Sequence, residues 1–217
     1  VLPSVSALGF GVGPLLLAAE PATAPEMGSE QLTLCPGAHT TAALLFQIFY
    51  AGKSRVEHVV FSDIMPRLRA KQANFGVCIH EGRFTWQREG LALVEDLGTR
   101  WEQETHCPLP LGGIFARRGL APELIARAQD AIADSIEYAM RHPDQAIPTM
   151  RKHAQEFDDD VLMQHVELYV NQWTRDLGNE GKLALDELSR RSADAGVTDG
   201  STSLEIFGPQ ALQGTGV

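Results

Sequence analysis

The sequence predicts an α/β protein, and three observations support this fold class. Short apolar strand patterns alternate with helical patterns between residues 31 and 113, which is typical of a parallel-rich sheet with helices on its faces. From Pro122 onwards, apolar residues recur every three or four positions, which is typical of helices. Hydrophobic residues make up 44% of the 217 residues, enough for a buried core.

The composition excludes several classes of protein. A net charge of −10 disfavours nucleic-acid binding, which needs a basic face. The longest apolar stretch, residues 9–19, is interrupted by Gly11, Gly13 and Pro14 and is shorter than the roughly 18 residues of a membrane span. No basic segment followed by an apolar one indicates a secretory signal. We therefore expect a cytoplasmic protein that binds no membrane, and the sequence is compatible with a homodimer.

The three cysteines, Cys35, Cys78 and Cys107, are far apart and match neither a C-x-x-C motif nor a zinc-binding spacing. Each lies in or beside an apolar segment. We therefore expect buried thiols in a reducing cytoplasm and no metal site.

The first half of the chain predicts alternating strands and helices. Residues 8–19 predict one strand; its glycines do not make a phosphate loop, because no strand precedes them and Pro14 lacks an amide proton. A connector rich in Pro, Ala, Gly and Ser follows at residues 21–29. Strands or strand-like apolar patterns are expected at Gln31–Cys35, Val56–Phe61, Phe75–Ile79, Gly90–Leu97 and Pro108–Ala116, and helices at Ala42–Tyr50, Ile64–Ala73 and Arg100–Thr105, the last with Thr99 as its cap.

The second half predicts four helices. The first begins near Pro122, the second at Pro143, and the fourth covers residues 179–191. Asp158, Asp159 and Asp160 favour the start of the third, because consecutive carboxylates suit a helix dipole better than one metal ion. The tail from Asp194 is expected to be loosely ordered.

The predicted strand Phe75–Ile79 changes abruptly to His80-Glu81-Gly82-Arg83. Ligands of open α/β sheets bind at the carboxyl edge of the strands. The unperturbed pKa of histidine lies near neutrality, so His80 is a candidate general base. A surface turn with a solvated histidine is the alternative, and a salt bridge to a neighbouring carboxylate is the simpler role for Arg83.

A second candidate feature is the helix start after Pro36-Gly37. Thr40 or Thr41 can cap this helix, because a threonine hydroxyl accepts a hydrogen bond from an amide of the first turn. The first-turn amides and the positive end of the helix dipole favour a carboxylate or phosphate. An ordinary capped helix explains the same pattern.

Four motifs, in this order, resemble those of the 1,4-dihydroxy-6-naphthoate synthases of the futalosine route to menaquinone. They are Pro36-Gly-Ala-His-Thr-Thr-Ala42, His80-Glu-Gly-Arg-Phe-Thr-Trp86, Asp96-Leu97-Gly98 with Trp101-Glu102, and Pro108-Leu-Pro-Leu-Gly-Gly113. The helices after Pro122, with Tyr169-Val170-Asn171, are similar to the family's C-terminal region. The family's N-terminal units, which contain a Ser-Tyr-Gly loop, have no counterpart here, and we expect the sequence to lack that segment.

The resemblance implies a two-lobed fold similar to the type II periplasmic binding proteins, with mixed sheets flanked by helices and a helical C-terminal region. Residues 31–113 would form the inserted second lobe, and residues 1–30 and 114–217 the first. The implied reaction is a cofactor-free carbon–carbon lyase step that converts a small molecule, cyclic dehypoxanthine futalosine, to 1,4-dihydroxy-6-naphthoate.

The resemblance also assigns residues to this reaction. His80 matches the family's proton acceptor, and Thr41 and Ala42 match its substrate contacts. The alternatives are chorismate dehydratase of the same pathway and fold, a non-catalytic solute-binding protein, and an inactive fragment.

Overall fold

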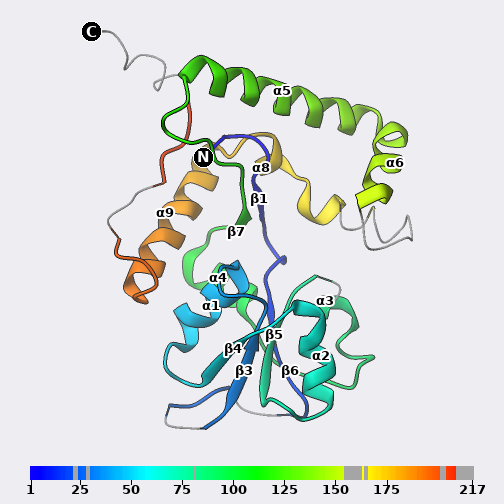
Figure 1. Cartoon of the computed structure of the whole chain (residues 1–217), viewed down its shortest axis with the longest axis vertical. Helices are drawn as coiled ribbons and strands as arrows, with labels where there is room; N and C mark the ends of the chain where they lie inside the picture. Colours follow the sequence, from blue (N-terminus) through cyan, green and yellow to red (C-terminus); the bar gives the residue numbers. More distant parts are fainter. Residues whose placement is uncertain are drawn as a thin grey trace. The chain divides into compact units, whose positions relative to one another are not determined.

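The computed structural model describes residues 1–21, 24–27, 30–80, 82–153, 163, 166–200 and 204–208. The chain divides into two compact units (Figure 1). The sheet unit comprises Phe10–Leu109 and Glu187–Thr202. The helical unit comprises Val1–Gly9, Pro110–Asp186 and Ser203–Val217.

The sheet unit is built on a five-stranded sheet in the order β4-β3-β5-β2-β6. β3 pairs in parallel with β4 and β5, whereas β2 pairs antiparallel with β5 and β6. Every strand except β2 therefore runs in one direction, which confirms the expected mixed sheet. The strands are β2 (Leu15–Ala18), β3 (Leu32–Cys35), β4 (Arg55–His58), β5 (Phe75–Cys78) and β6 (Ala92–Asp96).

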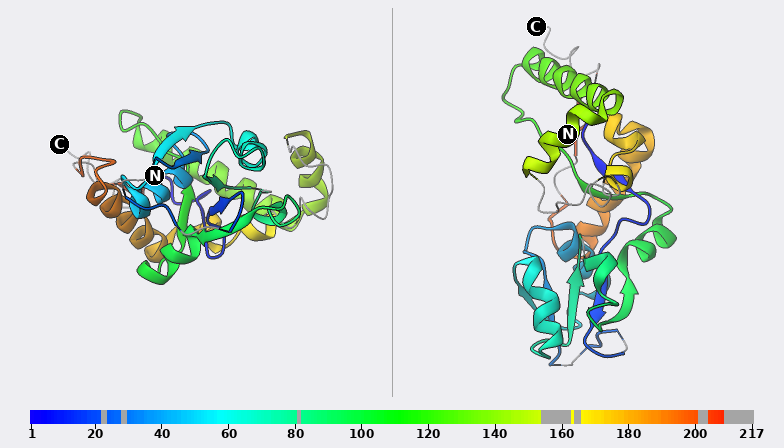
Figure 2. Two further views of the ribbon diagram at one scale, coloured as in Figure 1. Left: turned by 90° about the horizontal axis from the view of Figure 1, so that it is seen from below. Right: turned by 90° about the vertical axis from the view of Figure 1, so that its right-hand side faces the viewer.

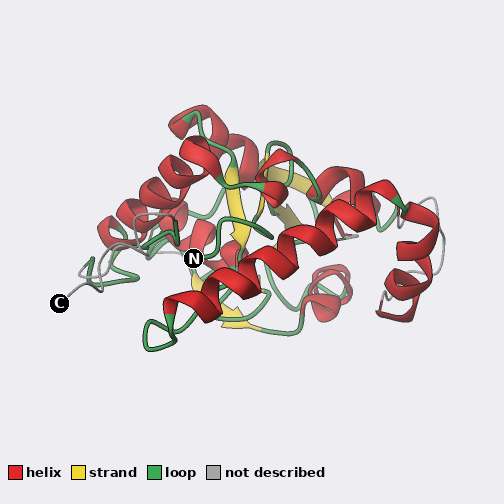
Figure 3. Ribbon diagram, turned by 90° about the horizontal axis from the view of Figure 1, so that it is seen from above, coloured by secondary structure: helices red, strands yellow, loops and turns green. Residues whose placement is uncertain are grey.

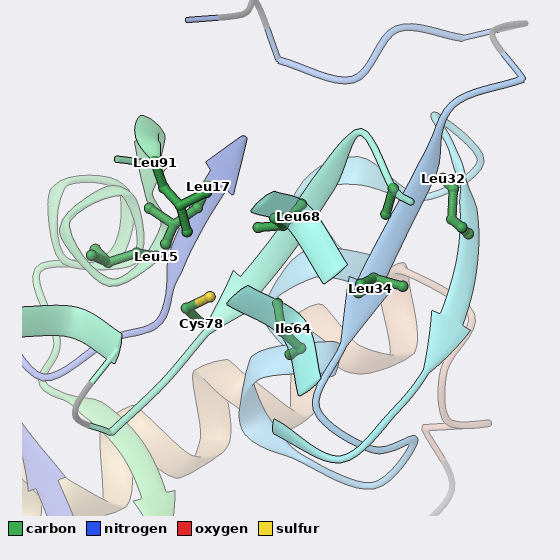
Figure 4. Close-up of a cluster of buried hydrophobic side chains, with 9 residues drawn as sticks. Leu15, Leu17, Leu32, Leu34, Ile64, Leu68, Cys78 and Leu91 are labelled. Carbon is green, nitrogen blue, oxygen red and sulfur yellow. The ribbon is translucent and has the colours of Figure 1, made fainter. Parts of the chain in front are cut away.

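Helices cover both faces of this sheet. They are α1 (Thr41–Tyr50), α2 (Phe61–Arg69), the single-turn α3 (Gly82–Thr85) and α4 (Leu97–Thr105). Ile64 and Leu68 of α2 pack with Leu34 and other strand leucines in a buried cluster (Figure 4). Gly76 of β5 permits this approach, because a Cβ there would lie 2.4 Å from Ile64 Cγ2. Side chains alternate along a strand, so the neighbours of Gly76 point to the opposite face, where α1 contacts β5 and α4 contacts β2.

The expectation of one strand over residues 8–19 was wrong. The structure has two strands there, β1 (Ala7–Gly9) and β2, separated by a turn in which Gly11 has φ +70°. Gly13 approaches Gly98 so closely that a Cβ on Gly13 would lie 2.2 Å from Gly98 Cα. This contact with the start of α4 bends the chain. β2, part of the residues 1–30 that we expected to contribute to the first lobe, pairs with β5 and β6 of the five-stranded sheet.

Two helix starts differ from those predicted. Phe61, expected to end a strand, is the first residue of α2, and β4 ends at His58. Thr99 is not the cap of α4; Asp96 is, and its Oδ1 accepts a hydrogen bond from the Thr99 amide at 3.0 Å. The carboxylate is the stronger cap, and the threonine three residues later supplies the donor.

The helical unit contains a small sheet in which β1 pairs with β7 (Leu109–Gly112), shorter than the predicted Pro108–Ala116. Its helices confirm the predicted starts at Pro122 and Pro143 and the predicted fourth helix. They are α5 (Pro122–Arg141), α6 (Pro143–His153), α8 (Gln172–Arg175) and α9 (Gly178–Asp194), of which α9 ends in the sheet unit. Asn171 caps α8 and donates from Nδ2 to the Leu8 carbonyl at 2.7 Å, which ties α8 to β1.

Helices α5 and α6 have no buried side chain. α5 is a long rod, and α6 turns away from its axis (Figures 2 and 3). The acidic triplet Asp158–Asp160, predicted to start a helix, lies outside the described residues, as do parts of the connector at residues 21–29 and of the C-terminal tail. None of the described helices has the length and apolar character that crossing a membrane requires.

The predicted burial of the cysteines is confirmed for Cys35 and Cys78, while Cys107 is half-buried, and all three are free thiols. Burial raises the pKa of the Cys35 and Cys78 thiols to about 12, so neither is a nucleophile near neutral pH. Among the residues that the structure describes, no cluster of histidine, cysteine and acidic side chains could hold a metal ion.

Candidate functional site

Segments from all five strands of the sheet unit meet at one edge of its sheet. The carboxyl ends of β3, β4, β5 and β6 lie there, and the register pairs Leu15, the first residue of β2, with both Cys78 and Asp96. We call this the carboxyl edge. It is formed by residues 11–14, 37–42, 59–61, 79–80, 82–83 and 96–98.

His80 follows β5 at the carboxyl edge, as predicted. Its side chain is exposed, so a ligand can reach the imidazole. Its backbone is left-handed, with φ +54°. The imidazole meets the Phe61 ring edge-on, with 5.2 Å between the ring centroids. Sequence reasoning missed Phe61, because the residue had been assigned to the end of a strand.

Thr40, rather than Thr41, caps α1. Its Oγ1 accepts from the Ala43 amide at 3.1 Å and donates to the Gly37 carbonyl at 3.1 Å. Thr41 is then the first helical residue and is half-buried. The Ala42 methyl group is buried, so any contact with a ligand would come from its backbone amide.

Thr41 and His80 therefore lie at the ends of neighbouring strands. β3 and β5 are adjacent and parallel, with Leu34 opposite Gly76. The helix start after β3 and the turn after β5 consequently meet the same edge. Three helices of nine or ten residues, α1, α2 and α4, begin at this edge. Their positive dipole ends favour an anionic ligand there.

Arg83 makes the salt bridge that the sequence favoured, and its partner is Asp96. Arg83 Nη2 lies 2.8 Å from Asp96 Oδ2, and Nη1 donates to the Gly13 carbonyl. The other partner, Gly13, could not be found from the sequence, because it lies 70 residues away along the chain. Glu81 lies outside the described residues.

A cavity elsewhere in the sheet unit suits a ligand less well than the carboxyl edge. It is a cavity of about 350 Å³ between α1, α4 and the end of α9. Each of its three arginines, Arg100, Arg190 and Arg191, is paired with a carboxylate within 2.9 Å. Their charge is neutralised within the fold, so the carboxyl edge remains the better candidate site.

Sequence comparisons find close relatives that are named as enzymes. A family model described as menaquinone biosynthesis matches residues 1–194. The 1,4-dihydroxy-6-naphthoate synthase of Thermus thermophilus is 44% identical over 187 residues, which cover 86% of this chain and 67% of that protein. The enzyme of the same name from Streptomyces coelicolor is 39% identical over 217 residues, covering 98% of this chain and 74% of that protein.

Solved structures confirm the expected fold. A crystal structure of a protein from Archaeoglobus fulgidus matches with a TM-score of 0.81 and 27% identity, covering 91% of this chain and 73% of that one. The ligand-binding component of an ABC-type import system from Staphylococcus aureus matches with a TM-score of 0.60 and 13% identity, covering 99% and 74%. A periplasmic sulfonate-binding protein from Methylobacillus flagellatus matches with a TM-score of 0.55 and 13% identity, covering 91% of this chain and 63% of that one. These two likenesses show a fold similar to the periplasmic binding proteins. The chain belongs to the menaquinone-biosynthesis family that includes the 1,4-dihydroxy-6-naphthoate synthases.

Proposed function

We propose that the protein is a cytoplasmic 1,4-dihydroxy-6-naphthoate synthase, a carbon–carbon lyase that acts on cyclic dehypoxanthine futalosine without a cofactor. The observation that supports this most is the carboxyl edge. It presents an exposed imidazole, His80, beside the amide-rich start of α1. Relatives 39% and 44% identical carry the name of this enzyme.

In the proposed reaction, neutral His80 accepts a proton from a substrate hydroxyl. The oxygen lone pair becomes a carbonyl π bond, and the adjacent carbon–carbon bond breaks in the manner of a retro-aldol step. The electron pair of that bond stays on the other carbon, which is then protonated. A positioned general base typically accelerates such a step by about 10²–10⁴-fold.

The start of α1 would hold the carboxylate that the naphthoate product retains. The positive end of the α1 dipole lies at its first turn, to which Thr41 and Ala42 belong. The helix dipole contributes roughly 0.3–2 kcal/mol for one negative charge. This binding orients the substrate and leaves the bond-breaking step to His80.

The test of the proposed base is His80→Asn. Asparagine tolerates the left-handed conformation at φ +54°, so the turn should fold as before. We expect kcat for release of the naphthoate chromophore to fall about 10²–10⁴-fold, with substrate affinity unchanged.

The matched control is His106→Asn. His106 is also left-handed, with φ +56°, but it ends α4 and lies away from the carboxyl edge. Its replacement should leave kcat unchanged. Equal losses of kcat and affinity in His80→Asn would indicate a structural role and contradict the proposal.

Thr41→Val tests the binding role of the helix start. The substitution removes one hydroxyl at the first helical position and keeps the cap, which belongs to Thr40. We expect a higher KM with kcat nearly unchanged. An unchanged KM would show that the Thr41 hydroxyl does not bind the substrate.

Assays with alternative ligands separate the rival functions. Turnover of chorismate in place of the cyclic futalosine derivative would identify a dehydratase of the same pathway. Tight binding without turnover would identify a solute-binding protein or an inactive fragment.

A further inference from the structure

The conformation of His80 needs support from outside its own turn. A left-handed backbone costs a residue other than glycine free energy, and it persists where surrounding contacts impose it. His106 has such support locally, because it ends α4 and its amide donates to the Glu102 carbonyl at 2.9 Å. The His80 turn has two local hydrogen bonds, from the Gly82 amide to the Ile79 carbonyl at 3.2 Å and from the Arg83 amide to the His80 carbonyl at 3.1 Å, but it leads only into α3, a single turn of four residues.

Arg83 supplies contacts that reach beyond this turn. Its guanidinium binds the Gly13 carbonyl and, at 2.8 Å, the Asp96 carboxylate. The side chains of Arg83 and Asp96 are 16% and 21% exposed, so this ion pair is largely shielded from water. Arg83 thereby joins the turn after β5 to two other segments.

Both anchors of Arg83 are held by contacts of their own. Asp96 uses its second carboxylate oxygen to cap α4 at Thr99. Gly13 packs against Gly98, and the Leu97 amide donates to the neighbouring Pro14 carbonyl at 3.0 Å. The anchors thus form a fixed platform at the start of α4, and Arg83 fastens the His80 turn to it.

We propose that Arg83 is a positioning residue that holds the His80 imidazole in its reactive orientation at the carboxyl edge. The proposal rests on the proposed role of His80 as general base. The guanidinium group of Arg83 makes two contacts, and both are with protein atoms, Gly13 O and Asp96 Oδ2. Arg83 therefore acts through His80 and not by binding the substrate. Its loss should therefore lower kcat and leave KM unchanged.

The experiment compares Arg83→Met and Arg83→Lys with Arg67→Met. Arg67 is the matched control, because it forms a two-bond ion pair with Glu57, at 2.7 and 3.1 Å, on the exposed surface of the same unit. A misplaced catalytic group costs up to about 10²-fold in rate. We expect kcat to fall about 10–100-fold in Arg83→Met. The fall should be smaller in Arg83→Lys, which keeps the positive charge but loses the planar guanidinium that binds two acceptors at once. KM should stay within about twofold in both variants. Arg67→Met should match the parent.

A double variant shows whether Arg83 acts through His80. In the His80→Asn background, Arg83→Met should cause no further loss of kcat, because residues that act as one unit are not additive. The proposal would be overturned if the losses of kcat in the two single variants multiplied in the double variant. It would also be overturned if Arg83→Met raised KM and left kcat unchanged.

Asp96→Asn guards against a failure of Arg83→Met to fold. Asparagine still caps a helix but removes the charge that binds Arg83. It should lower kcat in the same way as Arg83→Lys, and an unchanged kcat in a folded Asp96→Asn protein would overturn the positioning role. If His80→Asn itself keeps full kcat, the proposed function fails; if only the Arg83 and Asp96 variants keep it, the positioning role alone fails.

Discussion

The sheet unit and the helical unit bury their apolar residues to different extents. Every residue of β2, β3 and β5 is buried, and so are six residues of α1. In the helical unit, α5 and α6 comprise 20 and 11 residues, and none of these is buried. A catalytic side chain must be held in a fixed position, and closely packed, buried neighbours provide this. The candidate site accordingly lies in the sheet unit, where packing fixes the backbone.

Individual glycines differ in how closely neighbouring atoms approach them, and each unit has both kinds: a Cβ on Gly181 of the helical unit would lie 2.6 Å from Leu177 Cδ1, whereas Gly90 of the sheet unit has nothing within 4 Å. Gly13, Gly76 and Gly98 of the sheet unit each have a neighbour within 2.5 Å of a Cβ placed there. Gly112 and Gly119 of the helical unit have nothing within 4 Å. Substitutions at these positions therefore measure how tightly the chain is packed around each glycine.

The largest effect is expected for Gly13→Ala. The added methyl group would meet the Gly98 backbone at 2.2 Å, and a backbone cannot move aside as a side chain end can. We expect a loss of more than about 3 kcal/mol in the free energy of unfolding by urea, at the upper end of overpacking effects.

The control for this prediction is Gly112→Ala, which adds a methyl group to open space at the end of β7. It should change stability by no more than about 0.5 kcal/mol. Similar losses in both variants would remove the contrast between the units.

A smaller loss is expected for Gly76→Ala. Its methyl group would lie 2.4 Å from Ile64 Cγ2 and 2.9 Å from Leu68 Cδ1, so α2 must shift away from the sheet. Overpacking of this kind costs about 1–3 kcal/mol, measurable by urea denaturation. A stability equal to that of the parent would mean that α2 is held loosely.

The next effect depends on pH, and it compares a paired carboxylate of the sheet unit, Glu187, with one of the helical unit, Glu137. Hydrogen bonds from Arg190 and then Arg191 lower the pKa of Glu187, in the sheet unit, to about 2. A carboxylate with a depressed pKa stabilises the fold above its unfolded value near 4.5, and the contribution is lost as the pH falls towards 2. We expect Glu187→Gln to lower Tm at pH 7 and to match the parent near pH 2.

Glu137 of α5 is the matched control in the helical unit. Its pKa is also lowered by Arg141 and Arg175, but the group is exposed to solvent, which screens its ion pairs. Glu137→Gln should therefore change Tm less than Glu187→Gln at pH 7. The opposite order would show that the ion pairs of α5 are the stronger ones.

The smallest effect is expected on the exposed stripe of α5. Leu124 is 52% exposed, so Leu124→Ala removes little buried surface and introduces a good helix former. Stability measured by thermal unfolding should change by no more than about 0.5 kcal/mol. A loss above about 1 kcal/mol would show that another surface covers this helix in solution, and the contrast between the units would then be smaller.

Local patterns in the sequence determined much of this fold and of its site. The strand before Pro36, the helix from Thr41 and the helices from Pro122 and Pro143 follow from periodicity, caps and prolines, which act within one or two turns of chain. The position of His80 at the end of a strand was predictable for the same reason.

Only the tertiary structure decided the contacts that depend on distant segments. Gly13 meets Gly98 where the predicted first strand divides, and β2 lies between β5 and β6. The antiparallel pairing of β2 with both β5 and β6 places Asp96, at the end of β6, where the guanidinium of Arg83 can bind it. Residues far apart in the chain meet only when the sheet forms, so no local pattern records which partner each will find.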